Sequence, residues 1–169
     1  MYPFKQTFPT PAEHTPWKNT CEYIIIHHTW TWEWTIKWVL DWLYKRDDYA
    51  SCHFVIDTNG DAYKIWNPTD ILWHAWESSW WKRKDMNKYS LWIEVIWPLS
   101  DGWFTSYQKV AVKKLIQHLM SAFKIPKENV LRHKDIAPKR KWDISDTFFS
   151  PWYTGYEQFR DKLVPKLID

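Results

Sequence analysis

Two adjacent histidines end the first apolar run of the chain. His27 directly follows residues 24–26, three isoleucines, and a side chain at the end of such a buried strand can project into a cleft. His133 and Asp143 lie in a later polar segment, RHKDIAPKRKWD. Histidine and carboxylate are suitable zinc ligands, and three protein ligands plus a water make a catalytic zinc site. Singly, each histidine is more often a surface or hydrogen-bonded residue, so it is the combination that makes them candidate ligands.

Strand-like segments position these residues and one carboxylate. Residues 21–29, CEYIIIHHT, form a β-branched apolar run typical of a buried strand. Residues 90–97, SLWIEVIW, predict another strand, in which Ile93 and Val95 point to one face and Glu94 to the other.

A hairpin and helices account for most of the rest. Asn59-Gly60, between strand-like residues 52–57 and 61–66, is a hairpin turn signature. Helical spacing of apolar residues predicts helices over residues 35–46 (Ile36, Val39, Leu40, Leu43) and 106–124 (Val110, Leu115, Leu119, Phe123). Residues 132–146 are expected to form an ordered loop, and a short helix over residues 156–166 closes the domain.

This order predicts an α/β fold with a central mixed β-sheet flanked by α-helices. The 169 residues suit one domain. We assign residues 1–20, which carry four prolines, to an extended N-terminal arm and residues 21–169 to the folded domain.

Charge and cysteine content limit the partners. The formal net charge is +3, from 23 basic and 20 acidic residues without a long block of one sign, which does not argue for nucleic acid binding. Cys21 and Cys52 are too few for a disulfide scaffold. The N-terminus has no apolar run after a basic start, so neither a signal peptide nor an integral membrane segment is expected.

Five motifs occur in a familiar order: IIIHHT, SCHFVIDTNGDAYKI, WHAW, NKYSLWIEV and RHKDIAPKRKWD. With them the chain resembles, from about residue 21 to residue 145, the zinc-dependent N-acetylmuramoyl-L-alanine amidases of the type 2 amidase group. This group is related to bacteriophage T7 lysozyme and to the peptidoglycan recognition proteins. The resemblance implies that the substrate is peptidoglycan or a muropeptide and that the protein acts as a monomer.

The resemblance also implies a role for each site residue. His27, His133 and Asp143 would hold Zn²⁺, and Glu94 would be the general base that activates a water and returns its proton to the L-alanine nitrogen. Lys141, two residues before the last ligand, would help to stabilise the oxyanion. The bond broken would be the amide between N-acetylmuramic acid and L-alanine.

Four nearby residues have other expected roles. His28 should face away from His27 and lie in the core or behind the ligands. His53 is expected to make a structural hydrogen bond, and His74, in WHAW, to line the substrate cleft. Relatives carry a tyrosine where Cys52 stands, so any catalytic role of that tyrosine is absent here, and Cys52 is expected to be a small buried residue.

Tryptophan is abundant where glycine is scarce. The chain has 16 tryptophans and 3 glycines, whereas ordinary usage predicts roughly twelve glycines. Amidases commonly carry HAG and IGIE where this chain has residues 74–76 and 91–94, with tryptophan in the place of glycine. We hypothesise that eleven tryptophans mark UGA codons that the source organism reads as glycine: Trp30, Trp32, Trp34, Trp38, Trp42, Trp66, Trp76, Trp81, Trp92, Trp97 and Trp103. The alternative is an aromatic platform that stacks on sugar rings.

Other functions stay open at this point. A non-catalytic peptidoglycan-binding protein of the same fold is one, although such proteins lose a zinc ligand, and a polymerase-binding protein like T7 lysozyme is another without any support in the sequence. The chain could also be a poorly folded product of glycine codons read as tryptophan, because indoles in glycine positions cost about 1 to 3 kcal/mol each. The absence of a recognisable signal fits a cytoplasmic recycling amidase or an enzyme that reaches the wall by a phage-like route.

Overall fold

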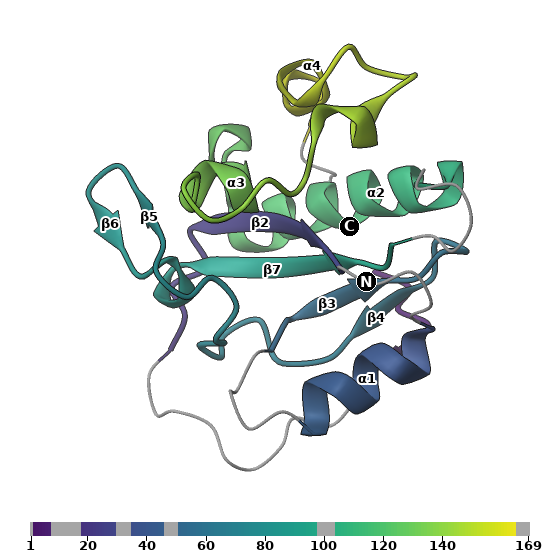
Figure 1. The fold of residues 1–169 in the computed structure, drawn as a ribbon, viewed down its shortest axis with the longest axis horizontal. Helices are drawn as coiled ribbons and strands as arrows, with labels where there is room; N and C mark the ends of the chain where they lie inside the picture. Colours follow the sequence, from purple (N-terminus) through teal and green to yellow (C-terminus); the bar gives the residue numbers. More distant parts are fainter. Residues whose placement is uncertain (1, 8–17, 30–34, 46–50, 98–103, 165–169) are drawn as a thin grey trace.

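The fold is built around a six-stranded mixed sheet (Figure 1). The computed structural model describes residues 2–7, 18–29, 35–45, 51–97 and 104–164. The strand order is β1-β4-β3-β7-β2-β8, and all neighbours are parallel except β3 and β4. The strands of this sheet are β1 (Gln6–Thr7), β2 (Tyr23–His28), β3 (Phe54–Ile56), β4 (Ala62–Lys64), β7 (Ser90–Val95) and β8 (Val130–Arg132).

Helices cover both faces of the sheet, as predicted. α2 (Ser106–Phe123) lies on one side and α1 (Ile36–Lys45) on the other (Figure 1). The remaining described elements are the hairpin β5 (Ser79–Trp80) and β6 (Arg83–Lys84), the short helices α3 (His133–Ile136) and α4 (Tyr156–Asp161), and the 3₁₀ turns Met86–Lys88, Lys127–Asn129 and Asp146–Phe149. No helix among the described residues is long and apolar enough to span a membrane.

Alternation along the strands creates two hydrophobic cores. Ile24 and Ile26 of β2 belong to the core under α2, whereas Ile25 belongs to the core under α1. On β7, Ile93 packs on the α2 side and Trp92 on the α1 side. His27 and Glu94, each two residues further along, therefore lie on the α1 face of the sheet.

The hairpin prediction is confirmed. β3 pairs antiparallel with β4, and Gly60 in the turn has φ +83°, a conformation that glycine adopts without steric cost. A Cβ atom at this position would also lie only 2.8 Å from the Tyr107 carbonyl oxygen. Glycine is thus required at residue 60 by both conformation and space.

The two longer helices are confirmed, and the short helix predicted over residues 156–166 ends earlier, at Asp161. Leu115 and Leu119 of α2 are buried, and Phe123 packs at the edge of the same core. Val110, another apolar position of this helix, is 40% exposed, because the buried stripe of α2 runs through Ala111 and its neighbours.

Two other differences concern short elements. The segment expected to be a loop over residues 132–146 begins with the helix α3. The N-terminal arm contributes β1, which adds a parallel strand beside β4. Elements of two to four residues make too few local hydrogen bonds to leave a periodic sequence pattern, so they depend on tertiary contacts.

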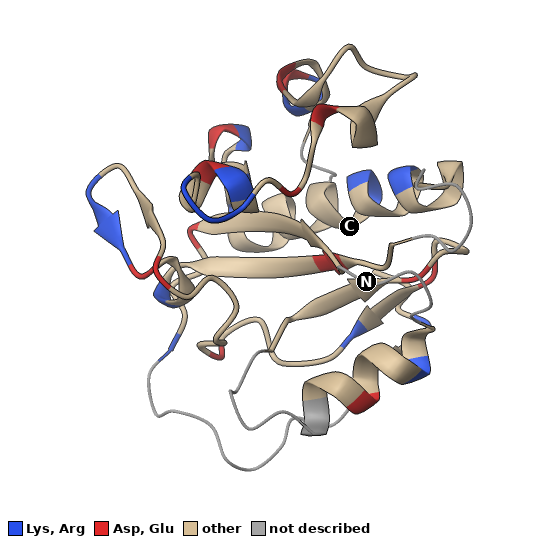
Figure 2. Ribbon diagram, in the orientation of Figure 1, with Lys and Arg blue, Asp and Glu red and all other residues tan. Residues whose placement is uncertain are grey.

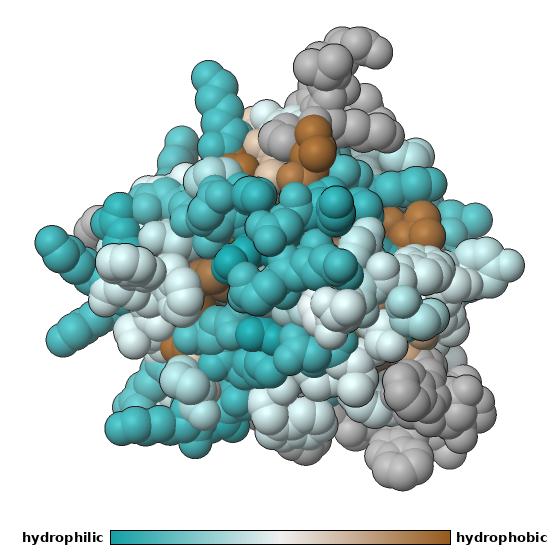
Figure 3. Space-filling model, turned by 90° about the horizontal axis from the view of Figure 1, so that it is seen from above, coloured by the Kyte–Doolittle hydropathy of each residue, from teal (hydrophilic) through white to brown (hydrophobic). Residues whose placement is uncertain are grey.

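Charged groups lie mainly outside the central strands. Lys and Arg gather on the β5–β6 hairpin and around α3 (Figure 2). Viewed from above, the surface is largely hydrophilic, with small, separate hydrophobic spots (Figure 3). That view therefore offers no broad apolar area.

Candidate metal centre

Three site residues meet at the carboxyl ends of neighbouring parallel strands. His27 on β2 is paired in register with Glu94 on β7. On the other side of β2, Ile26 pairs with Arg132, the last residue of β8, and His133 follows as the first residue of α3. Strand pairing therefore brings together two histidines that lie more than a hundred residues apart in the chain.

His27, His133 and Asp143 form a compact buried group. One potential ligand atom from each lies within 4.8 Å of the other two. Asp143 Oδ2 is 2.7 Å from His27 Nδ1 and 3.3 Å from His133 Nδ1. The residues are 6%, 0% and 0% exposed, respectively. Within the described ranges, no other set of three such side chains comes together in this way.

The donor atoms of this group fit a metal. His27 Nε2, His133 Nε2 and Asp143 Oδ1 are buried and have no hydrogen-bond partner, although buried polar atoms are normally paired. Two imidazoles and one carboxylate are suitable zinc ligands and leave a fourth position for a water. The predicted ligand set is thus present as one spatial cluster with free lone pairs.

Electrostatics favour the protonation states that a metal requires. Burial, together with the charge of His133, lowers the pKa of His27. Burial also lowers the pKa of His133. For Asp143, burial alone would raise the pKa, but the two histidines outweigh it and hold the pKa well below its usual range. Neutral imidazoles beside an ionised carboxylate are ready to bind a cation without first losing protons.

Glu94 and Lys141 border the cluster. Glu94 Oε2 lies 4.0 Å from His27 Nδ1, and the Glu94 side chain is 14% exposed. Burial raises the pKa of Glu94 to about 8, and the charge of Asp143 adds to this rise. The positive charge of Lys141 lowers the pKa of Glu94 and of both histidines, so the lysine lies close to the group. A carboxyl group with a pKa near neutrality is suited to take up and return a proton.

Trp92 packs directly on this cluster and was not predicted as a site residue. Its ring centroid lies 3.4 Å from that of His27 and 3.9 Å from that of His74. Its indole N–H donates a 2.9 Å hydrogen bond to Glu94 Oε2. The signal was in the sequence, because Trp92 lies two residues before Glu94 and hence on the same face of the strand.

The other histidines occupy supporting positions. His28 packs against Trp97 and Phe104 on the opposite face of the sheet, as expected. His53 accepts a hydrogen bond from the Trp92 backbone N–H, and its Nε2 lies 3.1 Å from the Asp70 carbonyl oxygen. Burial lowers the pKa of His53 to about 4, so it stays neutral. This contact is the structural hydrogen bond predicted for His53.

His74 lies beside the site. Its ring contacts Trp92, and its Nε2 lies 3.3 Å from Ser90 Oγ. Burial lowers its pKa, and the charges of His53 and His27 add to the effect.

The Cys52 thiol is fully buried, which raises its pKa well above the ordinary value and disfavours a nucleophilic thiolate.

The sequence matches one family over most of its length. The family model described as N-acetylmuramoyl-L-alanine amidase aligns with residues 17–146, a range that contains every candidate site residue. The chain belongs to this amidase family.

Two curated relatives of the family are similar in sequence. The chain is 32% identical over 100 residues to 1,6-anhydro-N-acetylmuramyl-L-alanine amidase AmpD of Haemophilus influenzae, covering 59% of this chain and 54% of the relative. It is 30% identical over 121 residues to N-acetylmuramoyl-L-alanine amidase AmiD of Escherichia coli, covering 63% of this chain and 43% of the relative. The chain therefore spans about half the length of the curated relatives it matches.

Solved structures share the amidase fold. A mutant endolysin from Bacillus subtilis superposes with a TM-score of 0.73 at 22% identity, covering 97% of this chain and all of the endolysin chain. The E. coli AmiD structure, a complex with anhydro-N-acetylmuramic acid-L-Ala-D-gamma-Glu-L-Lys, gives a TM-score of 0.68 at 24% identity and covers 95% of this chain and 63% of that chain. These likenesses establish the predicted mixed-sheet architecture as that of the amidase fold.

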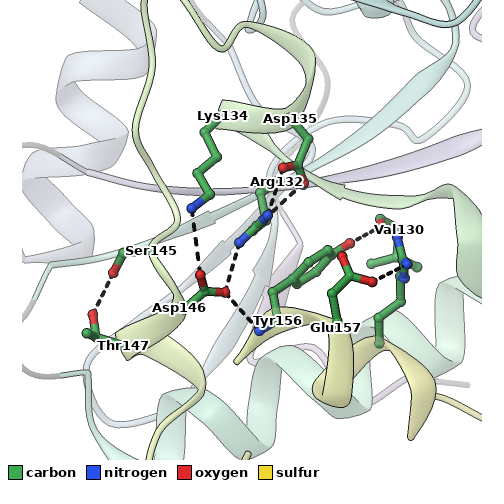
Figure 4. Close-up of polar contacts among 10 residues, drawn as sticks. Val130, Arg132, Lys134, Asp135, Ser145, Asp146, Thr147, Tyr156 and Glu157 are labelled. Carbon is green, nitrogen blue, oxygen red and sulfur yellow. Dashed lines mark hydrogen bonds and ion pairs between the residues drawn. The ribbon is translucent and has the colours of Figure 1, made fainter. Parts of the chain in front are cut away.

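A network of polar contacts holds the segment that supplies three of the candidate site residues, His133, Lys141 and Asp143 (Figure 4). Arg132 makes two hydrogen bonds to Asp135, of 3.0 Å from Nε and 2.9 Å from Nη2, and one of 3.0 Å from Nη1 to Asp146 Oδ1. The same Asp146 oxygen accepts a hydrogen bond from the Tyr156 backbone N–H, and the Arg132 guanidinium lies 4.3 Å from the centre of the Tyr156 ring. We call Arg132, Asp135, Asp146 and Tyr156 the Arg132 clamp.

Two candidate ligands, His133 and Asp143, lie between residues of the clamp in the sequence. Arg132 immediately precedes His133, and Asp146 follows Asp143 by three residues. Between them, the Lys134 N–H donates a 2.7 Å hydrogen bond to the Asp143 carbonyl oxygen. The two candidate ligands are thus held together by this backbone hydrogen bond and by the clamp, in addition to the 3.3 Å contact between their own side chains.

A large groove lies next to the amidase site. Its volume is about 1040 Å³, and it is bounded by the β5–β6 hairpin region and by the residues that follow α3. Its described lining residues are Trp73, Trp76, Glu77, Ser78, Ser79, Lys84, Asp85, Asn87, Ile136, Ala137, Pro138, Lys139 and Arg140. Neither the three candidate ligands nor His74 is among them, so the expectation that His74 lines the cleft finds no support in this groove.

Two of the eleven tryptophans adopt a backbone conformation typical of glycine. Trp76 has φ +43° and Trp81 has φ +52°, in the left-handed region that β-carbon-bearing residues rarely occupy. Both side chains are exposed, at 72% and 87%. Other members of the set lie outside the described residues: Trp30, Trp32, Trp34 and Trp103. The local backbone at Trp76 and Trp81 agrees with the hypothesis that these codons encode glycine.

Proposed function

We propose that this protein is a zinc-dependent amidase that hydrolyses the bond between N-acetylmuramic acid and L-alanine in peptidoglycan or in muropeptides. One observation carries the proposal: His27, His133 and Asp143 converge with unpaired buried donor atoms beside the Glu94 carboxyl group. This combination of two imidazoles and a carboxylate with an adjacent acid–base group is suited to metal-assisted amide hydrolysis.

The metal and the acid–base group would have separate tasks. Zn²⁺ held by His27, His133 and Asp143 would supply a Lewis acid and lower the pKa of a bound water toward neutrality. Glu94, whose pKa burial raises to about 8, would take a proton from the attacking water. It would then give this proton to the leaving L-alanine nitrogen, which makes departure of the neutral amine possible.

Lys141 would complete the site as a source of positive charge. Its ammonium group is close enough to shift the pKa values of Glu94 and His27. A cation in this place would stabilise the negative charge that develops on the carbonyl oxygen during attack. It would also favour binding of a substrate that carries carboxylates.

A soluble muropeptide is the substrate that we favour. AmpD, by its name, acts on 1,6-anhydro-N-acetylmuramyl-L-alanine, and AmiD was solved with an anhydro-muropeptide. The groove beside the site offers Lys84, Lys139 and Arg140 to the carboxylates of a stem peptide. We propose that the protein acts as a monomer. We also propose that it acts either in the cytoplasm or, after release by a phage-like route, at the cell wall.

A metal and product assay tests the proposal. Purified protein is expected to bind about one zinc per chain and to release L-alanyl peptide from anhydro-muropeptide faster than from intact sacculi. Glu94→Gln should keep its zinc and lose about 10²- to 10⁴-fold in turnover, the range for removal of a general acid–base group. His118→Ala, on α2 away from the site, is the matched control and should change neither quantity.

The competing function gives a different result. A peptidoglycan-binding protein without catalysis would bind the muropeptide, as measured by calorimetry. It would release no peptide from either anhydro-muropeptide or intact sacculi, even with zinc present. That outcome would refute the amidase proposal.

A further inference from the structure

The indole of Trp92 fills the space beside the candidate metal centre. Its ring lies 3.4 Å from His27, 3.9 Å from His74 and 5.2 Å from His133, measured between centroids. Favourable aromatic pairs have centroids about 4.5 to 7 Å apart, so the two shortest contacts are tighter than ordinary packing. Trp92 itself is only 2% exposed.

The same side chain is hydrogen-bonded to the proposed acid–base group, Glu94. The Trp92 indole N–H donates to Glu94 Oε2 at 2.9 Å. A carboxylate has about four lone-pair sites on its two oxygens, and the indole N–H takes one of them on Glu94 Oε2. A water or substrate group that enters the site therefore has one acceptor position fewer on Glu94.

Access to the site is correspondingly poor. The three candidate ligands are at most 6% exposed, and among the described residues none of them lines the large groove. Trp92 belongs to the same hydrophobic cluster as Ile136, which does line that groove. The buried cluster that contains the indole thus includes one lining residue of the groove.

We propose that residue 92 controls access to the metal centre: with tryptophan the indole restricts entry of substrate, and with glycine substrate enters more readily. This inference rests on the proposed amidase function and assigns residue 92 as the determinant of access for the same reaction. Glycine at residue 92 would remove the indole from its contact with His27 and free the acceptor position on Glu94 Oε2.

Cobalt(II)-substituted protein and acetohydroxamic acid provide a test that does not depend on turnover. The hydroxamate binds an accessible metal and changes the visible spectrum of cobalt. Trp92→Gly and Trp92→Ala are expected to bind it at least 10-fold more tightly than the unsubstituted chain. Trp152→Gly, which removes a half-exposed indole that lines a different pocket beside α2, should bind it like the unsubstituted chain.

Three results would overturn the proposal. One is equal hydroxamate affinity in the unsubstituted chain and both Trp92 variants. Another is a rise of the same size in Trp152→Gly. The third is loss of cobalt binding in both Trp92 variants, which would make Trp92 a structural support of the site.

Peptide release from anhydro-muropeptide separates this proposal from the amidase function. If both Trp92 variants bind the hydroxamate more tightly but release no peptide, residue 92 controls access and the amidase function is wrong. If the unsubstituted chain releases peptide as fast as Trp92→Gly, the amidase function stands and control by residue 92 is refuted.

Discussion

The metal centre and the Arg132 clamp are neighbouring polar clusters that differ in how completely their atoms are paired. In the metal centre, His27, His133 and Asp143 each keep a buried donor or acceptor without a partner. In the clamp, Arg132 donates hydrogen bonds to two carboxylates and stacks on an aromatic ring. The polar groups of the clamp are paired with one another, whereas the three candidate ligands leave buried lone pairs that a cation would fill.

This difference separates binding from support. Unpaired buried polar groups cost about 1 to 3 kcal/mol each and persist where a ligand satisfies them. Paired charged groups hold the backbone in one arrangement. The segment from Arg132 to Asp146 contains parts of both clusters. A substitution in the metal centre should therefore change mainly metal affinity, and a substitution in the clamp should also change the free energy of unfolding.

The largest effect is expected from removal of a ligand. His133→Ala should reduce zinc affinity by more than about 100-fold, because loss of outer-shell partners alone costs 10- to 100-fold. Zinc should also stop stabilising this variant against thermal unfolding. Competition with a coloured chelator measures the affinity, with His118→Ala as control. Retained zinc affinity in His133→Ala would remove His133 from the ligand set.

Glu94 should make the stability of the metal-free protein depend on pH. Burial raises its pKa from 4.5 to about 8, so the folded state favours the protonated form. Its contribution is therefore fully present below pH 4.5 and is lost as the pH rises to about 8. At about 1.4 kcal/mol per pKa unit, the full difference is about 5 kcal/mol.

Urea unfolding of metal-free protein and of Glu94→Gln isolates this contribution. The difference in unfolding free energy between the two should shift by several kcal/mol in favour of the glutamine variant between pH 4.5 and pH 8. The histidines titrate in both proteins and cancel in the comparison. A difference that does not change with pH would mean that Glu94 is solvated.

Breaking the clamp should affect both stability and metal affinity. The Arg132 and Asp135 side chains are only 12% and 16% exposed, and hydrogen bonds to charged groups contribute about 1.5 to 3 kcal/mol. Arg132→Met is expected to lower the free energy of unfolding by about 2 to 3 kcal/mol. It should weaken zinc binding by about 10-fold, as for outer-shell changes.

Arg83→Met is the matched control for the clamp. Arg83 pairs with Glu22 at 2.7 Å, but its side chain is 43% exposed, and exposed ion pairs contribute little to stability. This variant should keep normal zinc affinity. If Arg132→Met also keeps it, the clamp supports the fold without positioning the ligands.

The smallest effect concerns tryptophans outside both clusters. Trp81→Gly should stabilise the protein by about 1 kcal/mol, because a left-handed backbone costs 1 to 2 kcal/mol in residues with a Cβ atom. Trp38 is 62% exposed in the helix α1, where glycine lowers stability by about 0.5 to 1 kcal/mol. The two substitutions should therefore have opposite signs in urea unfolding.

The codons of the gene test the same hypothesis directly. UGA at residues 76, 81 and 92 would agree with glycine in the native protein. UGG at these residues would contradict it, and destabilisation by Trp81→Gly would argue against backbone strain there.

The sequence by itself determined the elements with strong local patterns. The β-branched run of β2, the Asn59-Gly60 turn and the amphipathic helix α2 each follow from residue type and spacing. The turn and the helix make their hydrogen bonds within a short segment, and the apolar β-branched residues of β2 favour a strand although its partners β7 and β8 are distant in the sequence. The motifs also identified the family and pointed to His27, His133 and Asp143 as ligands. The resemblance therefore predicts that these three residues meet in space.

Tertiary structure alone decided how these elements complete one another. The short strands β1 and β8, the helix α3 and the Arg132 clamp depend on contacts between distant segments, for which no periodic pattern exists. The exposure of Val110 and the position of the Trp92 indole against His27 depend on which neighbours face each strand and helix. The sequence predicts the residues that can bind a metal, and the packing of side chains such as Trp92 determines how accessible they are to a substrate.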